Sequence, residues 1–237
     1  MDLKGKVVVI TGAAGALGSE VARVFARAGA RLALVDRVEE PLIELAGEIG
    51  GEALPLGGVD LTDEDSVGEL AARVMAHYGR VDVLLNIAGG YRAGTPVHET
   101  PLAIWDFMLN LNARTVLLTA RAFVPHLIAG GGGRIVSVAS RSALEANRGD
   151  AAYAASKSAV MRLTESLAKE LGQHRIAANC IIPAAIDTPA NRKSMPGADF
   201  SKWVQPEQIA QVLLFLASDA SAAVTGAAIP VYGFGMV

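Results

Sequence analysis

Short apolar runs alternate along this chain with longer segments in which apolar residues recur every three or four positions. The first pair is the β-branched run Val7–Thr11 and the helical rhythm of Leu17–Ala28, which ends at Gly29. An apolar run of four to eight residues is typical of a buried strand, and a longer periodic segment is typical of a helix. The pattern therefore predicts a strand followed by a helix, and the same order repeats to the end of the chain.

The other predicted elements continue this alternation. Further strands are predicted at Arg31–Val35, Ala53–Asp60, Val81–Asn86, Arg134–Val138, Ala178–Ile182 and Ala228–Val231. Further helices are predicted at Glu40–Ile49, from an N-cap at Thr62 to about His77, and at Leu111–Ala129, Ala151–Leu171 and Glu207–Ala217. The strand at Ala53–Asp60 is the weakest prediction, because Pro55 cannot donate a hydrogen bond to a neighbouring strand.

The predicted strands are continuous apolar runs, which is the pattern of strands buried on both faces. Strands separated by helices form parallel sheets, since a parallel pair needs a long crossover connection. No linker or change of composition divides the 237 residues. We therefore predict an α/β fold in one domain, residues 1–237. It is a doubly wound (Rossmann) parallel sheet of about seven strands with helices on both faces.

Composition excludes several classes of protein. The 21 Lys and Arg against 24 Asp and Glu give a net charge of −3, which offers no basic surface for nucleic acid. One cysteine, Cys180, excludes a disulfide framework and a cysteine-based zinc site, and the four histidines show no metal-ligand spacing. No apolar run reaches the roughly 18 residues of a membrane span. We expect a cytoplasmic protein with no metal, membrane or nucleic-acid partner.

A glycine-rich turn lies between the first strand and the first helix. Glycines there let the backbone approach a pyrophosphate, which the N–H groups of the helix N-terminus then bind. The candidate contacts are Gly12, Ala14, Gly15, Ala16, Leu17 and Gly18. A glycine-rich βα turn without a ligand is the alternative, but Asp36 follows about twenty residues later at the end of the second strand, as expected for dinucleotide binding.

Residues at the ends of the next strands extend this candidate site. The Asp36 carboxylate would accept hydrogen bonds from a ribose diol and repel a 2′-phosphate, whereas the neighbouring Arg37 could bind that phosphate or stack on adenine. NAD(H) is therefore favoured and NADP(H) stays possible. Asp60 and Leu61 are candidates for the adenine edge. The segment Asn86–Gly89, including Ala88, would let a cofactor lie against the backbone.

Tyr153 and Lys157 are the candidate catalytic pair. They are four residues apart on a predicted helix, so they lie on one face. A nearby ammonium group favours the phenolate and lowers a tyrosine pKa that is about 10 in free peptides. Such a phenol can act as a general acid or base. Taken alone the pair also fits a surface Tyr and Lys, but Ser140 follows a strand at the carboxyl edge of the sheet, where ligands bind in such folds.

Taken together, these motifs resemble the short-chain dehydrogenase/reductase family over nearly the whole chain. The resemblance is carried by Thr11-Gly12 with Gly18, Asp36, Asn86-x-Ala88-Gly89, Asn112, Ser140, Tyr153-x-x-x-Lys157, Pro183 and Asp187-Thr188-Pro189. It implies hydride transfer between a nicotinamide cofactor and a carbonyl or secondary alcohol.

The resemblance also implies a role for each matching residue. Tyr153 would be the acid/base, Lys157 would lower its pKa and bind the nicotinamide ribose, and Ser140 would orient the carbonyl. Asn112 would hold a water in a proton relay. The carboxamide of the cofactor would meet the segment after Pro183, at Ile186 and Thr188. Family members are homodimers or homotetramers, so a homo-oligomer is expected, with Leu111–Ala129 and Ala151–Leu171 paired across a two-fold axis.

Three departures from the family pattern leave the substrate open. The middle glycine is Gly15 and Ala16 follows it, as in dihydropteridine reductases; Ala184 follows Pro183 where glycine is usual; and Tyr232 replaces a common aspartate. Residues 187–205, a polar segment expected to be a substrate lid, also resemble a loop of quinonoid dihydropteridine reductase, which lacks the serine present here at Ser140. Three hypotheses follow: a carbonyl/alcohol oxidoreductase of 3-oxoacyl type, a quinonoid dihydropteridine reductase, and a nucleotide-sensing protein without turnover.

Overall fold

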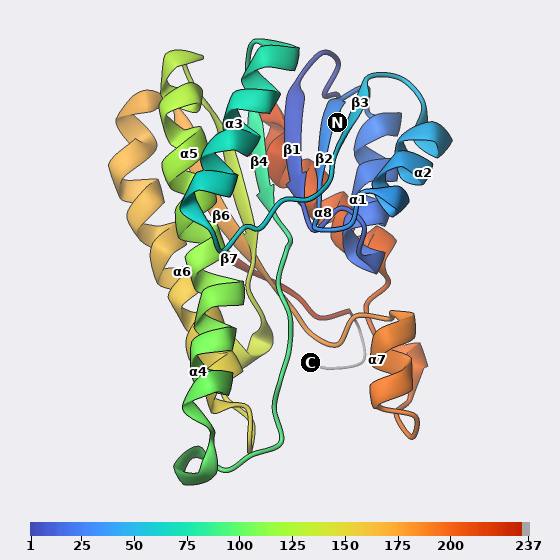
Figure 1. Cartoon of the computed structure of the whole chain (residues 1–237), viewed down its shortest axis with the longest axis vertical. Helices are drawn as coiled ribbons and strands as arrows, with labels where there is room; N and C mark the ends of the chain where they lie inside the picture. The colour runs from blue at the N-terminus through green and yellow to red at the C-terminus, as the bar shows by residue number, and fades with distance from the viewer. Residues whose placement is uncertain (234–237) are drawn as a thin grey trace.

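Seven parallel strands form one sheet in the order β3-β2-β1-β4-β5-β6-β7 (Figure 1). This computed structural model describes residues 1–233. The strands are β1 (Val7–Thr11), β2 (Arg31–Val35), β3 (Ala53–Leu56), β4 (Val83–Asn86), β5 (Gly133–Val138), β6 (Ile176–Pro183) and β7 (Ala228–Val231). The chain builds outward from β1 in one direction and then from β4 in the other. The order therefore reverses between β1 and β4, which is where ligands bind in doubly wound sheets.

The connections between the strands are helical. The α-helices are α1 (Ala16–Arg27), α2 (Glu40–Ile49), α3 (Glu64–Tyr78), α4 (Leu102–Leu109), α5 (Thr115–Ala129), α6 (Ala151–Leu171), α7 (Pro189–Ser194) and α8 (Pro206–Ala217). The predicted doubly wound α/β fold with about seven strands is confirmed. In Figure 1, α4 and α7 extend beyond the same end of the sheet.

Alternate residues of each strand enter two different hydrophobic cores. In β1, Val8 and Ile10 pack with α1, α2 and α8, whereas Val7 and Val9 pack with α3, α5 and α6. All five residues of β1 are buried, which explains why the strand is an uninterrupted apolar run in the sequence. The burial of both faces holds the strand ends in a fixed arrangement beneath the candidate site.

Three local predictions differ from the structure. Strand β3 ends at Leu56 and does not reach Asp60. The N-cap of α3 is Asp63, whose carboxylate accepts a hydrogen bond from the Ser66 N–H at 2.8 Å, because Thr62 is bound instead to the Asp60 carboxylate. The helix predicted from Leu111 is the end of a longer helical segment that starts at α4.

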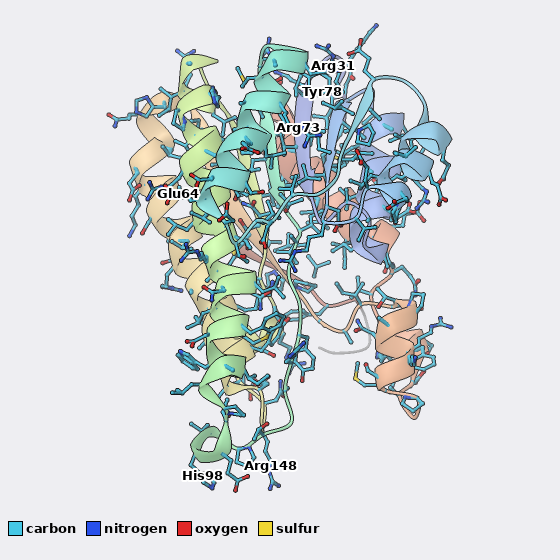
Figure 2. The ribbon with its side chains drawn as sticks, in the orientation of Figure 1. Arg31, Glu64, Arg73, Tyr78, His98 and Arg148 are labelled. Atoms are coloured by element: carbon cyan, nitrogen blue, oxygen red, sulfur yellow. The ribbon has the colours of Figure 1, made fainter. Side chains whose placement is uncertain are left out.

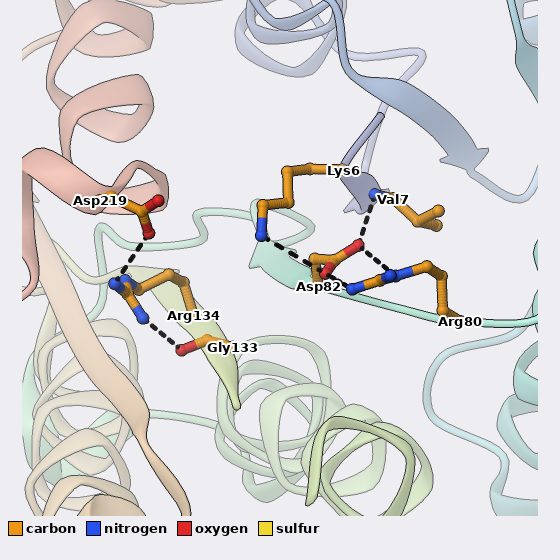
Figure 3. Close-up of polar contacts among 7 residues, drawn as sticks. All are labelled: Lys6, Val7, Arg80, Asp82, Gly133, Arg134 and Asp219. Atoms are coloured by element: carbon orange, nitrogen blue, oxygen red, sulfur yellow. Dashed lines mark hydrogen bonds and ion pairs between the residues drawn. The ribbon is translucent and has the colours of Figure 1, made fainter. Parts of the chain in front are cut away.

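The charged groups at the amino ends of the strands stabilise the sheet. The Asp82 carboxylate accepts hydrogen bonds from the Val7 N–H at 2.9 Å and from the Arg80 guanidinium, and it lies 3.9 Å from the Lys6 ammonium (Figure 3). These contacts join the start of β1 to the start of β4. They lie at the edge of the sheet opposite to the carboxyl ends of the strands.

Polar side chains also lie at the two opposite ends of the molecule. Tyr78 closes α3 and donates a hydrogen bond to the Leu32 carbonyl at 2.9 Å, beside Arg31 (Figure 2). Burial raises the pKa of Tyr78 to about 12, so this phenol is structural. His98 and Arg148 lie at the opposite tip, beyond α4 (Figure 2). Within residues 1–233, no helix has the length and apolar character needed to cross a membrane.

Candidate active site

A cavity of about 1400 Å³ opens at the carboxyl ends of the strands. Its lining includes Gly12 after β1, Asp36 after β2, Ala88 after β4, Ser140 after β5 and Pro183 at the end of β6. Phe107 of α4 and Asn191 of α7 line it as well, so the two projecting helices of Figure 1 flank the opening. Five strand ends thus converge on one site, as a parallel sheet requires.

The glycine turn is shaped by close backbone approaches. Gly12 has φ of +71°, and a Cβ there would lie 2.9 Å from the backbone of Ala88. A Cβ on Gly18 would overlap the Gly12 carbonyl oxygen. These two positions therefore require glycine for the turn itself. Gly15 has an extended backbone, with φ of −73°. A Cβ on Gly15 would approach only the Gly12 carbonyl oxygen, at 3.3 Å.

Thr11 joins the two strand ends at the point where the strand order reverses. Its hydroxyl donates to the Leu85 carbonyl at 3.2 Å and accepts from the Ile87 and Ala88 N–H groups at 3.1 and 3.2 Å. This side chain is 1% exposed. The small residues after β4 are therefore held against the glycine turn, which leaves the cavity floor made of backbone.

The residues expected to select the cofactor form a connected polar group. The Asp36 carboxylate accepts hydrogen bonds from the Ala14 N–H at 3.0 Å and from the Arg37 N–H at 2.7 Å. The Arg37 guanidinium is bound to the Asp60 carboxylate at 2.6 Å. Hydrogen bonds from Thr62, with a further one from Arg37, lower the pKa of Asp60 to about 2. Each oxygen of Asp36 accepts one of these bonds and keeps a further lone pair, whereas Arg37 already has an anionic partner.

Ser140, Tyr153 and Lys157 all line the inner end of the cavity. The Lys157 ammonium is 4% exposed and donates to the Val138 carbonyl at 2.7 Å. Burial lowers the pKa of Lys157 to about 8. A Cβ on Gly89 would lie 3.2 Å from the Lys157 Nζ, so the missing side chain of that glycine leaves room beside the ammonium group.

The expected lowering of the Tyr153 pKa is wrong for this structure. Burial raises the pKa of Tyr153 above its usual value of 10.0, and the neighbouring Ser140 hydroxyl opposes this rise only in part. The ammonium of Lys157 is bound to Val138 and does not reverse the direction. The phenol therefore carries its proton at neutral pH.

Asn112 sits in a π-helical segment, Asn110–Arg114, between α4 and α5. Its side chain accepts from the Gly90 N–H at 3.0 Å and donates to the Gly90 carbonyl at 3.1 Å and to the Ser156 hydroxyl at 2.9 Å. Ser156 in turn donates to the Tyr153 carbonyl at 2.7 Å. π-Helical turns are frequent at functional sites. Here the side-chain amide is engaged with protein groups on every side, and it links the end of β4 to α6 beside Tyr153.

The segment after β6 is held at its base by an aspartate. Asp187 accepts two hydrogen bonds from the Arg192 guanidinium, at 2.5 and 2.7 Å, and one from Gln205 at 2.9 Å. Arg192 and then Gln205 lower the pKa of Asp187 to about 2. Thr188 caps α7 by accepting from the Asn191 N–H at 3.2 Å. The segment expected to be a substrate lid thus begins with a short helix whose base is held by Asp187.

Most of the predicted site residues line the cavity. They are Gly12, Gly15, Leu17, Gly18, Asp36, Arg37, Asp60, Leu61, Ala88, Gly89, Ser140, Tyr153, Lys157, Pro183 and Ile186. Ala14, Ala16, Asn86, Asn112 and Thr188 are not among the lining residues. The Asn86 side chain, for example, is 4% exposed and bound to Thr119 and Ser137 behind the site.

Tyr91 is the residue that the sequence reasoning missed. It follows the glycines after β4, lines the cavity, and packs edge-to-face on the Tyr153 ring with centroids 4.7 Å apart. The signal available in the sequence was an aromatic residue directly after a cofactor-facing strand end.

The cavity suits a dinucleotide by shape and by the groups it presents. Its volume of about 1400 Å³ exceeds the roughly 300–1,000 Å³ of a drug-sized pocket, which leaves space for a cofactor and a substrate. One end offers the Asp36 carboxylate, the middle offers the N-terminus of α1 at the glycine turn, and the other end offers Lys157 and Tyr153. A diol, a pyrophosphate and a second ribose match these three regions in that order.

Comparison with known proteins gives the family. The pattern described as short chain dehydrogenase matches residues 6–199. The chain belongs to the short-chain dehydrogenase/reductase family, and it is an NAD(P)-dependent dehydrogenase or reductase. It is 37% identical to the 3-oxoacyl-acyl-carrier-protein reductase FabG of Thermotoga maritima, an alignment that covers 98% of both chains. It is 35% identical to the D-threitol dehydrogenase of Mycolicibacterium smegmatis, over 98% of this chain and 93% of that protein.

Solved structures agree with this assignment. A 7α-hydroxysteroid dehydrogenase complexed with NADH and 7-oxo glycochenodeoxycholic acid is 32% identical, with a TM-score of 0.90 over 99% of this chain and 95% of that chain. An NAD⁺-bound xylitol dehydrogenase is 27% identical, with a TM-score of 0.91 over 99% and 100% of the two chains. The substrates named for these proteins differ widely, although all are alcohols or carbonyl compounds.

Proposed function

We propose that this enzyme reduces a ketone to a secondary alcohol with NADH, using Tyr153 as the proton donor. The observation that carries the proposal is the grouping of Ser140, Tyr153 and Lys157 at one end of a cavity whose other end is a dinucleotide-shaped site. When bound, the nicotinamide supplies the hydride. The residues of the chain hold the carbonyl, move the proton and exclude water.

Tyr153 fits the role of general acid in this reduction. A phenol that keeps its proton at neutral pH can donate it to the alkoxide that develops on the carbonyl oxygen. The Ser140 hydroxyl lies beside the phenol and would donate a second hydrogen bond to the same oxygen. Lys157 has one N–H on Val138, which leaves two for a ribose hydroxyl and a water.

Asn112 acts in this proposal as a positioning residue. It holds Gly90 on one side and Ser156 on the other, and Ser156 is bound to the backbone of Tyr153. The strand end that would contact the cofactor and the helix that carries the phenol are thereby fixed relative to each other.

The preference for NADH over NADPH rests on two carboxylates. Asp36 would accept the ribose hydroxyls and repel a 2′-phosphate, and Asp60 keeps the nearest cation, Arg37, in an ion pair. Ile186 and Pro183 line the cavity near the catalytic end, where the carboxamide would lie. Thr188 is proposed to contribute there after release from its capping bond to Asn191.

A quinonoid dihydropteridine is the second candidate substrate, because the glycine turn and the segment after Asp187 resemble those of dihydropteridine reductase. Ser140, which those reductases lack, favours the carbonyl substrate.

We also propose a homo-oligomer in the cytoplasm. Leu102, Trp105 and Leu117 of α4 and α5 are large apolar residues that are 79%, 39% and 45% exposed, which supports a contact between copies along these helices.

A panel assay tests the proposed function. The purified protein is mixed with NADH or NADPH and with small aliphatic ketones, aryl ketones, 3-oxoacyl thioesters and quinonoid dihydropterin, and oxidation of the cofactor is followed at 340 nm. Faster turnover of at least one ketone or 3-oxoacyl thioester with NADH is the expected result. Turnover of the dihydropterin alone would favour the second candidate. Firm cofactor binding without any turnover would contradict both and favour a nucleotide sensor.

A further inference from the structure

Tyr91 occupies a position that neither the family pattern nor the proposed chemistry explains. Its ring meets the Tyr153 ring edge-to-face, with centroids 4.7 Å apart and planes at 86°. The side chain is nevertheless 64% exposed, which is unusual for an aromatic ring in contact with a buried one. It therefore stands at the cavity wall directly beside the reacting phenol, where a bound substrate would touch it.

A second, smaller cavity lies behind Tyr91. Its volume is about 390 Å³, and its lining consists of Tyr91, Arg92, Ala93, Thr95, Thr100, Ile104, Gly149 and Ala152. Tyr91 and Ala93 belong to the linings of both cavities. Because the alanine is small, the Tyr91 ring is the main side chain at the boundary between the two cavities.

We propose that Tyr91 is a specificity-determining residue. By standing between the two cavities, its ring limits the width of the substrate group that lies beside the reacting carbon. This assignment rests on the proposed ketone reduction at Tyr153. In its native form the enzyme then accepts ketones with a narrow group on this side of the carbonyl and discriminates against those with a wide one.

The lining of the second cavity defines which groups would enter once the ring is removed. Ile104 and Ala152 are apolar, and the Thr100 hydroxyl already donates to the Pro96 carbonyl at 3.0 Å. The Arg92 guanidinium lies over the Phe107 ring, 4.4 Å from its centroid. With Ala93, Ile104 and Ala152 in its lining, the cavity suits a compact, largely apolar group such as a phenyl ring.

Two variants test the assignment by separating the ring from its hydroxyl. Tyr91→Ala removes the ring between the two cavities, whereas Tyr91→Phe keeps the ring and its packing on Tyr153. The substrates are the ketone that the native enzyme reduces fastest in the panel above and its analogue with a phenyl group in place of the narrow substituent. The measured quantity is the ratio of kcat/KM for the phenyl analogue to kcat/KM for the parent ketone.

Tyr91→Ala is expected to raise this ratio about 10-fold or more, since filling or emptying a pocket by a few carbon atoms changes discrimination by that amount. Tyr91→Phe is expected to leave the ratio near the native value. An unchanged ratio in Tyr91→Ala, with NADH affinity intact, would overturn the role of Tyr91 alone. A native enzyme that binds NADH but reduces no ketone would overturn the proposed function, and this assignment with it.

Discussion

The Arg37 guanidinium is held 2.6 Å from the Asp60 carboxylate, at the end of the cavity where the adenosine ribose would lie. Arg37 is the residue after Asp36, and it is the one cation among the lining residues between β2 and β4. Asp60 is itself fixed by Thr62, which donates to its other oxygen from both the hydroxyl and the N–H group. A guanidinium with an anionic partner in place is a poor ligand for a 2′-phosphate.

We therefore expect Asp60→Asn to shift the enzyme toward NADPH. The substitution keeps the size of the side chain and removes the charge that engages Arg37. The ratio of kcat/KM with NADPH to that with NADH should rise by up to about 5-fold, because an exposed ion pair contributes up to about 1 kcal/mol. Asp60→Asn combined with Arg37→Ala is the control, and it should lose the gain. An equal gain in both proteins would show that Arg37 is not the group released.

The geometry of the glycine turn predicts a large loss of stability for one alanine substitution and a small change for another, three residues away. Gly18→Ala places a methyl group in steric overlap with the Gly12 carbonyl oxygen. The substitution should therefore reduce the free energy of unfolding by about 3 kcal/mol or more. Gly15 has a φ of −73°, which alanine also adopts, and Gly15→Ala should change stability by less than about 1 kcal/mol. Urea unfolding of the two variants decides between them. Equal losses would contradict the close approach of Gly18 to Gly12.

Lys157 should make stability depend on pH in a defined window. Burial lowers its pKa from 10.5 to about 8, so between these values the unfolded chain binds more protons than the folded one. The free energy of unfolding contributed by Lys157 is thus lowest below pH 8 and rises toward pH 10.5, by roughly 3 kcal/mol over the full window. Lys157→Met is the reference, since it cannot titrate.

The measurement is the difference in unfolding free energy between the native protein and Lys157→Met at several pH values from 7 to about 10. The difference should move in favour of the native protein as the pH rises. A flat difference would contradict the depressed pKa, and a fall would indicate an ammonium group stabilised by its surroundings.

The hydrogen bonds that Asp187 accepts from Arg192 and Gln205, which we call the Asp187 clamp, should affect turnover more than folding. Its two bonds from Arg192 and one from Gln205 hold the start of the segment that lines the cavity with Asn191. Asp187→Asn weakens the clamp and should lower kcat/KM roughly 10-fold through looser positioning. Asp199→Asn, in the same segment but exposed, is the matched control. Similar losses in both variants would show that general charge, not the clamp, is responsible.

The lowered pKa of Asp187 also predicts the pH at which its hydrogen bonds from Arg192 and Gln205 are lost. The pKa of Asp187 is lowered to about 2, so its stabilising effect is complete above its ordinary value near 3.8 and is lost as the pH falls through 2. The segment should keep its arrangement throughout the pH range in which the enzyme is assayed.

Local backbone chemistry explains why much of this site could be predicted from the sequence. Gly12, Gly18 and Asp36 are required by short-range geometry: a turn, a close approach and a strand end. Tyr153 and Lys157 share a helix face, so their spacing alone brings both into one cavity. The burial of both sheet faces likewise gives β1 a sequence pattern that is independent of its partners.

The features that were missed depend on contacts between distant segments. Tyr91 and Tyr153 meet across 62 residues of chain, and no spacing rule connects them. The direction of the Tyr153 pKa depends on how much protein surrounds the phenol, which spacing on a helix does not give. Helix α4 was missed because Leu102 and Trp105 remain exposed, so its apolar residues do not form the single buried stripe that helix prediction uses.

The proton transfer from Tyr153 is the centre of this account, and Tyr153→Phe tests it most directly. The variant keeps the ring and its packing on Tyr91, so NADH affinity and the melting temperature should stay near the native values. Ketone reduction should fall by about 10²-fold or more, as expected on loss of a general acid. A Tyr153→Phe protein that binds NADH and reduces the ketone at the native rate would contradict the account.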